Sequence, residues 1–237
     1  MSPTITKGIS SEEIRSKDNH QKYVKEKEGN MSYDKKERRN VAEKKLINSH
    51  VVLLMDSNRK YIDVEKFWRG KRCTKMAAGN VEETRKIIDQ YNFINTKHII
   101  VHVGTNDVEN DEDSPEEICK NIIKIGLQLK NKYKLATVFI SQLPPRDDKF
   151  NGKSIKVNEL LTLNIPESLK LINNSNITKN DLHDKKHIRK EAIKMLVMNM
   201  KKAMKESRNI ITREEEIRGT DERRKNMADK DLHRTLK

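Results

Sequence analysis

The chain has 237 residues, of which 34% are hydrophobic and 36% are charged, so its apolar residues are too few for a core that fills the whole length. The net charge of +14 favours anionic partners such as nucleic acid or acidic membrane surfaces, although a lysine-rich composition alone would produce the same excess. No apolar run approaches the roughly 20 residues of a membrane span, and the N-terminus has no apolar signal segment. We therefore expect a soluble, intracellular protein, in the cytoplasm or the nucleus.

The apolar runs are confined to residues 49–206, which we expect to form one domain. Residues 1–48 and 207–237 are dense in charged and polar side chains, and we expect a solvated leader and a solvated or helical tail. The basic cluster at 35–39 could contact nucleic acid, but a solvated charged face is the simpler interpretation. The two cysteines have no metal-ligand spacing, so we expect free thiols and no metal site.

Three apolar, β-branched segments have the composition of buried strands, at residues 51–55, 98–104 and 136–141. Helical segments are predicted between and after them, at residues 61–68, 81–92, 115–129, 155–163 and 189–204. Asn80 with Glu83, and Ser114 with Glu117, have the spacing of capping boxes at two of the helix starts. Strands that alternate with helices predict a three-layer α/β/α sandwich with a parallel sheet.

Small polar residues follow the first two strands and should meet at one edge of the sheet, where ligands of open α/β sheets bind. Ser57 follows the first strand, and Asn106 follows the second. Asp184 and His187, three residues apart before the last helix, can contact each other and reach the same edge. A serine hydroxyl needs an adjacent base, and an imidazole held by a carboxylate is such a base. The Asn106 amide and the N–H groups of Ser57 and Gly79 are candidate oxyanion donors.

Two alternatives to this catalytic set remain open. Asp181 and His183 form a competing acid–imidazole pair in the same loop as Asp184 and His187. Cys73 could be a nucleophile, but no base is paired with it in the sequence.

Other polar residues near the predicted strands have simpler structural interpretations. Asp56 is expected to bind local backbone N–H groups, and His98 and His102 are expected to be structural residues of the central strand. Arg146, after two prolines, could bind an anionic ligand, but a salt bridge within its loop is favoured.

Three segments, Met55-Asp56-Ser57-Asn58, Gly104-Thr105-Asn106-Asp107 and Asp184-Lys-Lys-His187, resemble blocks I, III and V of the SGNH (GDSL-type) hydrolases in order, spacing and strand context. The resemblance implies a flavodoxin-like α/β/α fold and hydrolysis of small acyl esters through an acyl-serine, with no metal or organic cofactor. It implies that Ser57 is the nucleophile, His187 the base and Asp184 its orienting acid. The Ser57 N–H and Asn106 would form the oxyanion hole, with Gly79 as the block II glycine.

A narrower resemblance is carried by Ile140-Ser141-Gln-Leu-Pro-Pro145-Arg146, by Val157-Asn158 and by the Asp-Lys-Lys-His-Ile sequence that begins at Asp184. These segments are similar to the SGNH domains of some LINE-type retrotransposon proteins, and the basic flanks fit such an origin.

The sequence also departs from the SGNH pattern. Met55 replaces the family's glycine, and Ala192 stands near another glycine position of the last helix. If the turn after Met55 needed a positive φ, methionine would be strained there; we expect an ordinary turn in which Met55 packs below the site. A second hypothesis follows, in which a catalytically weak SGNH-like module binds nucleic acid or protein partners through its basic tails.

Overall fold

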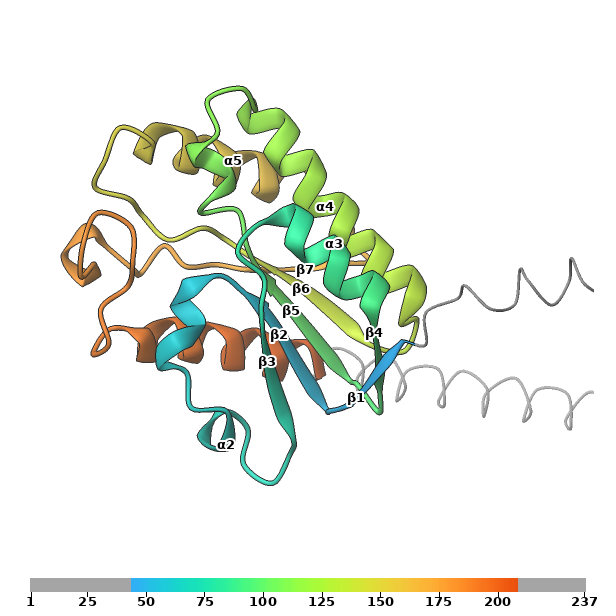
Figure 1. Ribbon diagram of the computed structural model, residues 1–237. Coiled ribbons are helices and arrows are strands. Elements are labelled where there is room, and N and C mark those ends of the chain that lie inside the picture. Colours follow the sequence, from blue (N-terminus) through green and yellow to red (C-terminus); the bar gives the residue numbers. More distant parts are fainter. Residues whose placement is uncertain (1–43, 209–237) are drawn as a thin grey trace, which may run out of the picture. The chain divides into compact units, whose positions relative to one another are not determined.

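The computed structural model in Figure 1 describes residues 44–208. The basic cluster at 35–39 and most of the predicted leader and tail lie outside the described residues. Strand β1 (Lys45–Asn48), which the sequence analysis placed in the leader, pairs in parallel with β4 (Tyr91–Ile94) in a small two-stranded sheet. The folded region therefore extends to Lys45.

The main sheet has five parallel strands in the order β3-β2-β5-β6-β7. Their bounds are β2 (Val51–Met55), β3 (Cys73–Ala77), β5 (His98–His102), β6 (Thr137–Ser141) and β7 (Lys170–Ile172). Numbered along the sheet's own strands, this is the 2-1-3-4-5 order of flavodoxin-like folds, and it confirms the predicted fold class. Strands β3, β4 and β7 were not predicted.

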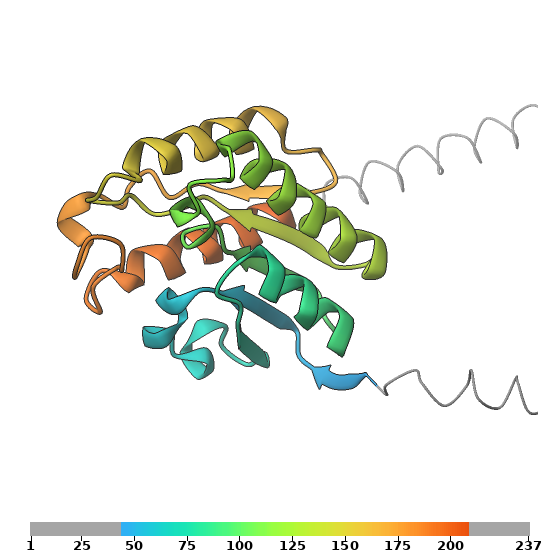
Figure 2. The ribbon, with the colours of Figure 1, turned by 45° about the horizontal axis from the view of Figure 1, so that its top comes forward.

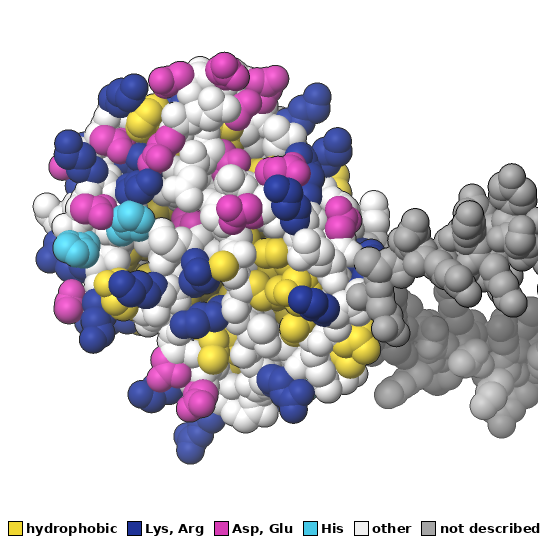
Figure 3. Space-filling view, viewed as in Figure 1, with side chains coloured by type: hydrophobic (Ala, Val, Ile, Leu, Met, Phe, Trp, Pro, Cys, Tyr) yellow, Lys and Arg dark blue, Asp and Glu magenta, His cyan; other side chains and the backbone are white. Residues whose placement is uncertain are grey.

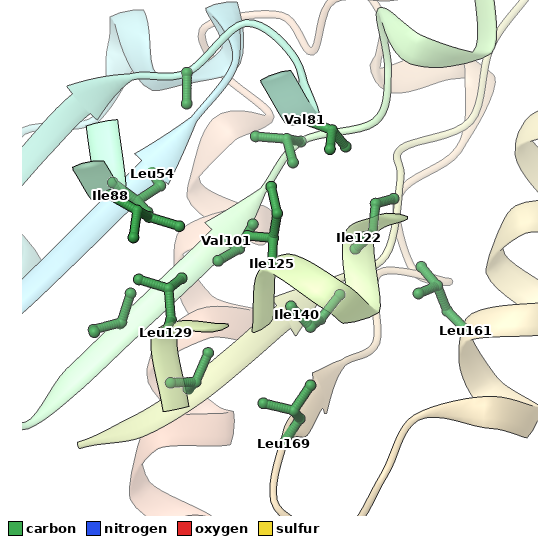
Figure 4. Packing of buried hydrophobic residues seen from close by; sticks show 14 of the residues in the cluster. Leu54, Val81, Ile88, Val101, Ile122, Ile125, Leu129, Ile140, Leu161 and Leu169 are labelled. Carbon is green, nitrogen blue, oxygen red and sulfur yellow. The ribbon is translucent and has the colours of Figure 1, made fainter. Parts of the chain in front are cut away.

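Helices cover both faces of this sheet (Figures 1 and 2). Helices α3 (Val81–Gln90), α4 (Pro115–Lys132) and α5 (Asn151–Asn164) lie on one face, and a helix over residues 193–208 lies on the other with the short α2 (Val64–Phe67). Alternate residues of each central strand point to opposite faces: Leu54 packs toward α3 and α4, and Leu53 toward the last helix. Figure 4 shows Leu54, Val101 and Ile140 of the sheet packed against buried residues of α4, which include Ile122, Ile125 and Leu129.

The starts of α3 and α4 coincide with the predicted capping residues. Ser114 and Glu117 form the expected capping box at the start of α4. At the start of α3 only half of the box forms: Asn80 accepts from the Glu83 N–H at 2.8 Å, but the Glu83 carboxylate binds the Gly79 N–H instead. Helix α3 ends at Gln90 because the following residues pair as β4, α5 begins at Asn151, and the last helix begins at residue 193.

Candidate active site

The carboxyl end of β2 presents Ser57 at the surface. Asp56, which is 1% exposed, caps the 3-10 turn η1 (Ser57–Tyr61) by accepting from the Asn58 N–H at 2.9 Å. Asp56 therefore has the structural role expected of it. The Ser57 side chain is exposed at the first position of this turn, where a substrate can reach it.

Met55 fits the fold without backbone strain. It is the last residue of β2, is fully buried, and pairs with Ala77 on one side and His102 on the other. Within residues 44–208, the one non-glycine residue with a left-handed φ is Asn95. Met55 therefore has an ordinary strand conformation, as expected, and its side chain packs on the face of the last helix.

The turn after β5 requires glycine. Gly104 has a φ of +119°, and a Cβ there would lie 2.9 Å from Leu143 and 3.0 Å from Ile122. The chain then runs across to the loop after β3, where Asn106 donates its Nδ2–H to the Gly79 carbonyl at 2.8 Å and Asp107 accepts from the Val81 N–H. These bonds place Gly79 and Asn106 side by side, as an oxyanion hole would require.

The Gly79 N–H is already engaged in this structure. It donates to Glu83 Oε2 at 2.7 Å. A carboxylate thus occupies the position in which an oxyanion would accept from Gly79. This competition was not visible in the sequence, where Glu83 was interpreted as a partner of Asn80.

Asp184 and His187 form the predicted pair. His187 Nδ1 lies 2.7 Å from Asp184 Oδ2, and Asp184 Oδ1 accepts from the backbone N–H groups of Lys186 and His187, both at 2.8 Å. Partial burial opposes ionisation, but the His187 ring and the two backbone N–H groups hold the pKa of Asp184 well below its usual range. Asp184 is therefore a carboxylate near neutral pH and can orient the imidazole.

The competing pair does not form such an arrangement. The Asp181 carboxylate accepts from both the backbone N–H and the hydroxyl of Thr178, so it caps a 3-10 turn. Cys73 is also disfavoured as a nucleophile, because burial raises the pKa of its thiol to about 12.

One buried hydrogen bond joins the serine turn to the histidine loop. Asn58 Oδ1 accepts from the Ile188 N–H at 3.0 Å. This bond holds the immediate neighbours of Ser57 and His187 together across 130 residues of sequence. Within residues 44–208 no direct hydrogen bond joins Ser57 to His187. Figure 3 shows histidine side chains exposed at the end of the domain where these loops lie in Figure 1.

A charged cluster around Arg146 supports both loops. Arg146, 1% exposed, donates to the Thr105 carbonyl at 2.7 Å and forms ion pairs with Glu109 and Asp148. The Glu109 carboxylate also binds Lys186 at 2.7 Å, and the Lys186 ammonium lies 3.4 Å from Asn106 Oδ1. The salt-bridge interpretation of Arg146 is thus confirmed, and its partners connect the Asn106 turn to the His187 loop. Nothing in the local sequence indicated Glu109 or Lys186, since their partners lie far along the chain.

His102 belongs to a second, fully buried polar group below the serine turn. Its Nδ1 lies 2.9 Å from Ser141 Oγ, which also accepts from Asn174, and its Nε2 lies 4.0 Å from Asp56. Burial lowers the pKa of His102, although the Asp56 carboxylate opposes this shift. His102 is therefore a neutral residue of the sheet interior, in agreement with its expected structural role.

The part of the chain that the structure describes contains no group of three or more His, Cys, Asp or Glu side chains placed to hold a metal ion. In the same residues, no helix is both long and apolar enough to cross a membrane.

The fold is shared with solved structures of lipolytic and acyl-group hydrolases of the GDSL type. A carbohydrate acetylesterase from Sinorhizobium meliloti matches with a TM-score of 0.53 and 14% identity, over 68% of this chain and 99% of that one. A GDSL-like lipase from Bacteroides thetaiotaomicron matches with a TM-score of 0.52 and 13% identity, over 67% and 89%. A family 3 carbohydrate esterase from Talaromyces cellulolyticus matches with a TM-score of 0.50 and 11% identity, over 65% and 94%. The central parallel sheet and its flanking helices thus match the SGNH hydrolase fold.

No protein-family model matches the sequence, and no curated protein matches it significantly.

Proposed function

We propose that this protein is a serine ester hydrolase of the SGNH type. The observation that carries the proposal is the 2.7 Å contact between Asp184 and His187, in a loop that the Asn58–Ile188 hydrogen bond holds against the turn of Ser57. The fold of esterases and acylhydrolases among the solved structures supports hydrolase chemistry. In this proposal Ser57 is the nucleophile, His187 the base and Asp184 the residue that orients the base.

The acylation step follows from this arrangement. Because Asp184 holds Nδ1 of His187, the Nε2 atom is left to accept the Ser57 proton as Oγ attacks the ester carbonyl carbon. The tetrahedral intermediate collapses when the C–O bond to the alcohol breaks, and His187 donates its proton to that leaving oxygen. An acyl-serine and a free alcohol result. Asp184 remains ionised throughout.

The second half of the cycle regenerates the enzyme. Water gives a proton to His187 as its oxygen attacks the acyl-serine, and the proton returns to Ser57 Oγ as the carboxylic acid leaves. The Ser57 N–H and the second N–H of Asn106 Nδ2 are the proposed oxyanion donors. Gly79 would join them once Glu83 releases its N–H, and each such donor typically contributes about 2.7–4 kcal/mol. Small acyl esters are the proposed substrates.

Labelling with a fluorophosphonate probe tests this proposal directly. We expect the probe to modify Ser57, as mapped by peptide mass spectrometry, and the Ser57→Ala variant to lose both the label and hydrolysis of p-nitrophenyl acetate. His187→Gln should slow both reactions strongly. Ser175→Ala, which changes another exposed serine in a loop, is the matched control and should behave as the unmodified protein. A folded protein labelled at another residue, or not labelled at all, would contradict the proposal.

We also propose a second candidate, a weakly catalytic SGNH-like module that binds nucleic acid or proteins through its basic tails, with an origin in a retrotransposon. The Glu83 carboxylate on the Gly79 N–H favours it, because an occupied donor would slow ester hydrolysis. The tails themselves lie outside the described residues. A folded full-length protein that binds a polyanion but shows neither labelling nor turnover would favour this candidate over the esterase.

A further inference from the structure

A cavity of about 390 Å³ lies at the amino edge of the sheet, opposite the edge that holds Ser57. The first residues of the three central strands, Val51, His98 and Thr137, stand in register and line it. The strands are five residues long, so this cavity and the candidate active site are separated by about 16 Å of strand. The cavity is therefore a separate place in the fold.

A broader hollow of about 700 Å³ continues from this cavity, since His50, Lys71 and Lys97 line both. We call the two together the amino-edge pocket. Its size is in the range of small-molecule sites.

The lining of the amino-edge pocket is basic and contains one large aromatic side chain. Lys71, Arg72 and Lys97 are exposed cations, and Arg208 lines the inner part. Within residues 44–208, no aspartate or glutamate lines either part. Trp68 is half-buried and stands beside His98, with 6.1 Å between the ring centroids. Such a surface attracts anions and offers a flat face for stacking.

Two buried imidazole nitrogens in this lining have no partner. The Nδ1 atoms of His50 and of His98 are both inaccessible to solvent and make no hydrogen bond among the described residues. Unpaired buried polar atoms are uncommon in folded proteins and require an explanation. Burial, together with the nearby Arg208 and Lys97 charges, lowers the pKa of His98 to about 4, so its ring is neutral near pH 7.

We propose that the amino-edge pocket binds a nucleotide and contacts both its phosphate and its base. The phosphate lies against Lys71 and Lys97, and the base stacks on Trp68, beside the rings of His50 and His98. The ligand is either a free nucleotide or one nucleotide unit of a single-stranded nucleic acid, whose neighbouring phosphates would follow the broader basic hollow toward Arg72. This site does not depend on ester hydrolysis at Ser57.

Trp68 is the one tryptophan of the whole chain, so its fluorescence reports on this pocket directly. The full-length protein is titrated with adenosine monophosphate, with a single-stranded oligothymidylate, with adenosine and with inorganic phosphate. We expect saturable quenching by the nucleotide, by the oligonucleotide, or by both, and weaker effects of adenosine or phosphate alone. Quenching by the free nucleotide alone would identify it as the source of the ligand, and tighter quenching by the oligonucleotide would identify the single strand.

Matched variants separate this pocket from general attraction to a basic protein. Lys71→Ala/Lys97→Ala should weaken the quenching titration at least about tenfold and lower its salt dependence, because two phosphate-binding charges are lost. Lys86→Ala/Lys124→Ala removes the same charge from exposed positions on α3 and α4 and should leave the titration unchanged. Ser57→Ala should also leave it unchanged, even if the esterase proposal fails.

Three results would overturn the proposal. One is Trp68 emission that neither the nucleotide nor the oligonucleotide changes, even where fluorescence anisotropy shows that the oligonucleotide binds. Another is equal weakening by the two double variants. A third is quenching by inorganic phosphate as strong as that by the nucleotide, which would leave no role for the base.

Discussion

Removing the Arg146 side chain should show how strongly the buried charged cluster holds the site together. Arg146 is 1% exposed and binds the buried Thr105 carbonyl, Glu109 and Asp148. In Arg146→Met a side chain of similar length remains, but all of these bonds are lost. Glu109 keeps its 2.7 Å ion pair with Lys186, and Asp148 keeps the Phe150 N–H. The loss of Arg146 therefore leaves fewer buried polar groups without a partner than the loss of one member of a typical buried ion pair.

The expected loss of stability follows from the number of groups that are left without a partner. Breaking a buried ion pair typically costs 3–5 kcal/mol, and a buried carbonyl without its donor costs about 1–3 kcal/mol. Because both acids keep a second partner, we expect the lower end, about 3 kcal/mol in the free energy of unfolding. For a domain of this size that corresponds to a fall in Tm of roughly 6–12 °C.

Urea denaturation followed by circular dichroism measures this loss, and a neighbouring lysine provides the control. Lys149, 73% exposed and 3.6 Å from Asp111, is also an ion-paired cation of the same loop. Lys149→Met should cost less than about 1 kcal/mol, because exposed pairs contribute little. Equal losses in the two variants would refute the argument that burial makes the Arg146 cluster important. Esterase activity should fall in Arg146→Met as well, since its partners hold the Asn106 turn and the His187 loop.

The same cluster and two substitutions near the serine give three further expectations. Arg146 lowers the pKa of Asp148 from its ordinary 3.8, so the stabilisation by this ion pair is complete above about pH 4 and is lost as the pH falls further. In acid denaturation, the difference in stability between the unmodified protein and Arg146→Met should therefore narrow between about pH 4 and pH 2. A constant difference would contradict the charge argument. Met55→Gly should change kcat/KM for p-nitrophenyl esters less than about tenfold, or 1.4 kcal/mol of barrier, while costing about 2–5 kcal/mol of stability; a hundredfold rise would show that Met55 blocks the site. Glu83→Ala should raise kcat roughly tenfold or more by freeing the Gly79 N–H, whereas Glu82→Ala on the same helix should not; a fall in kcat would exclude Gly79 as an oxyanion donor.

Much of the central fold could be predicted from the sequence, because the central strands are buried on both faces. Each of residues 51–55, 98–102 and 137–141 therefore contains at least three consecutive apolar residues, a signal that needs no knowledge of the partner strands. The strands that were missed lack this signal. Strand β3 is an edge strand with half-exposed polar residues, and β7 has three residues. Their assignment depends on the neighbouring strand that supplies the hydrogen bonds, which no local pattern reveals.

The candidate site likewise has contacts that the sequence predicts and contacts that depend on the fold. Asp184 and His187 lie three residues apart, so their contact is local and the sequence alone predicted it. Glu83 also acts locally, on the Gly79 N–H four residues before it, whereas the Gly79 loop and the Asn106 turn are joined by a hydrogen bond across 27 residues. Their placement is a property of the folded sheet.

The sequence by itself indicated which residues of this protein are candidates for chemistry, and that Ser57 and Asn106 follow the ends of strands. Only the tertiary structure decided which of them meet. The Asn58–Ile188 bond spans 130 residues, and the Arg146–Glu109 and Lys186–Glu109 pairs span 37 and 77. The physical reason is that side-chain hydrogen bonds act over about 3 Å, whereas the distance between such residues along the chain is set by how the whole sheet pairs and packs.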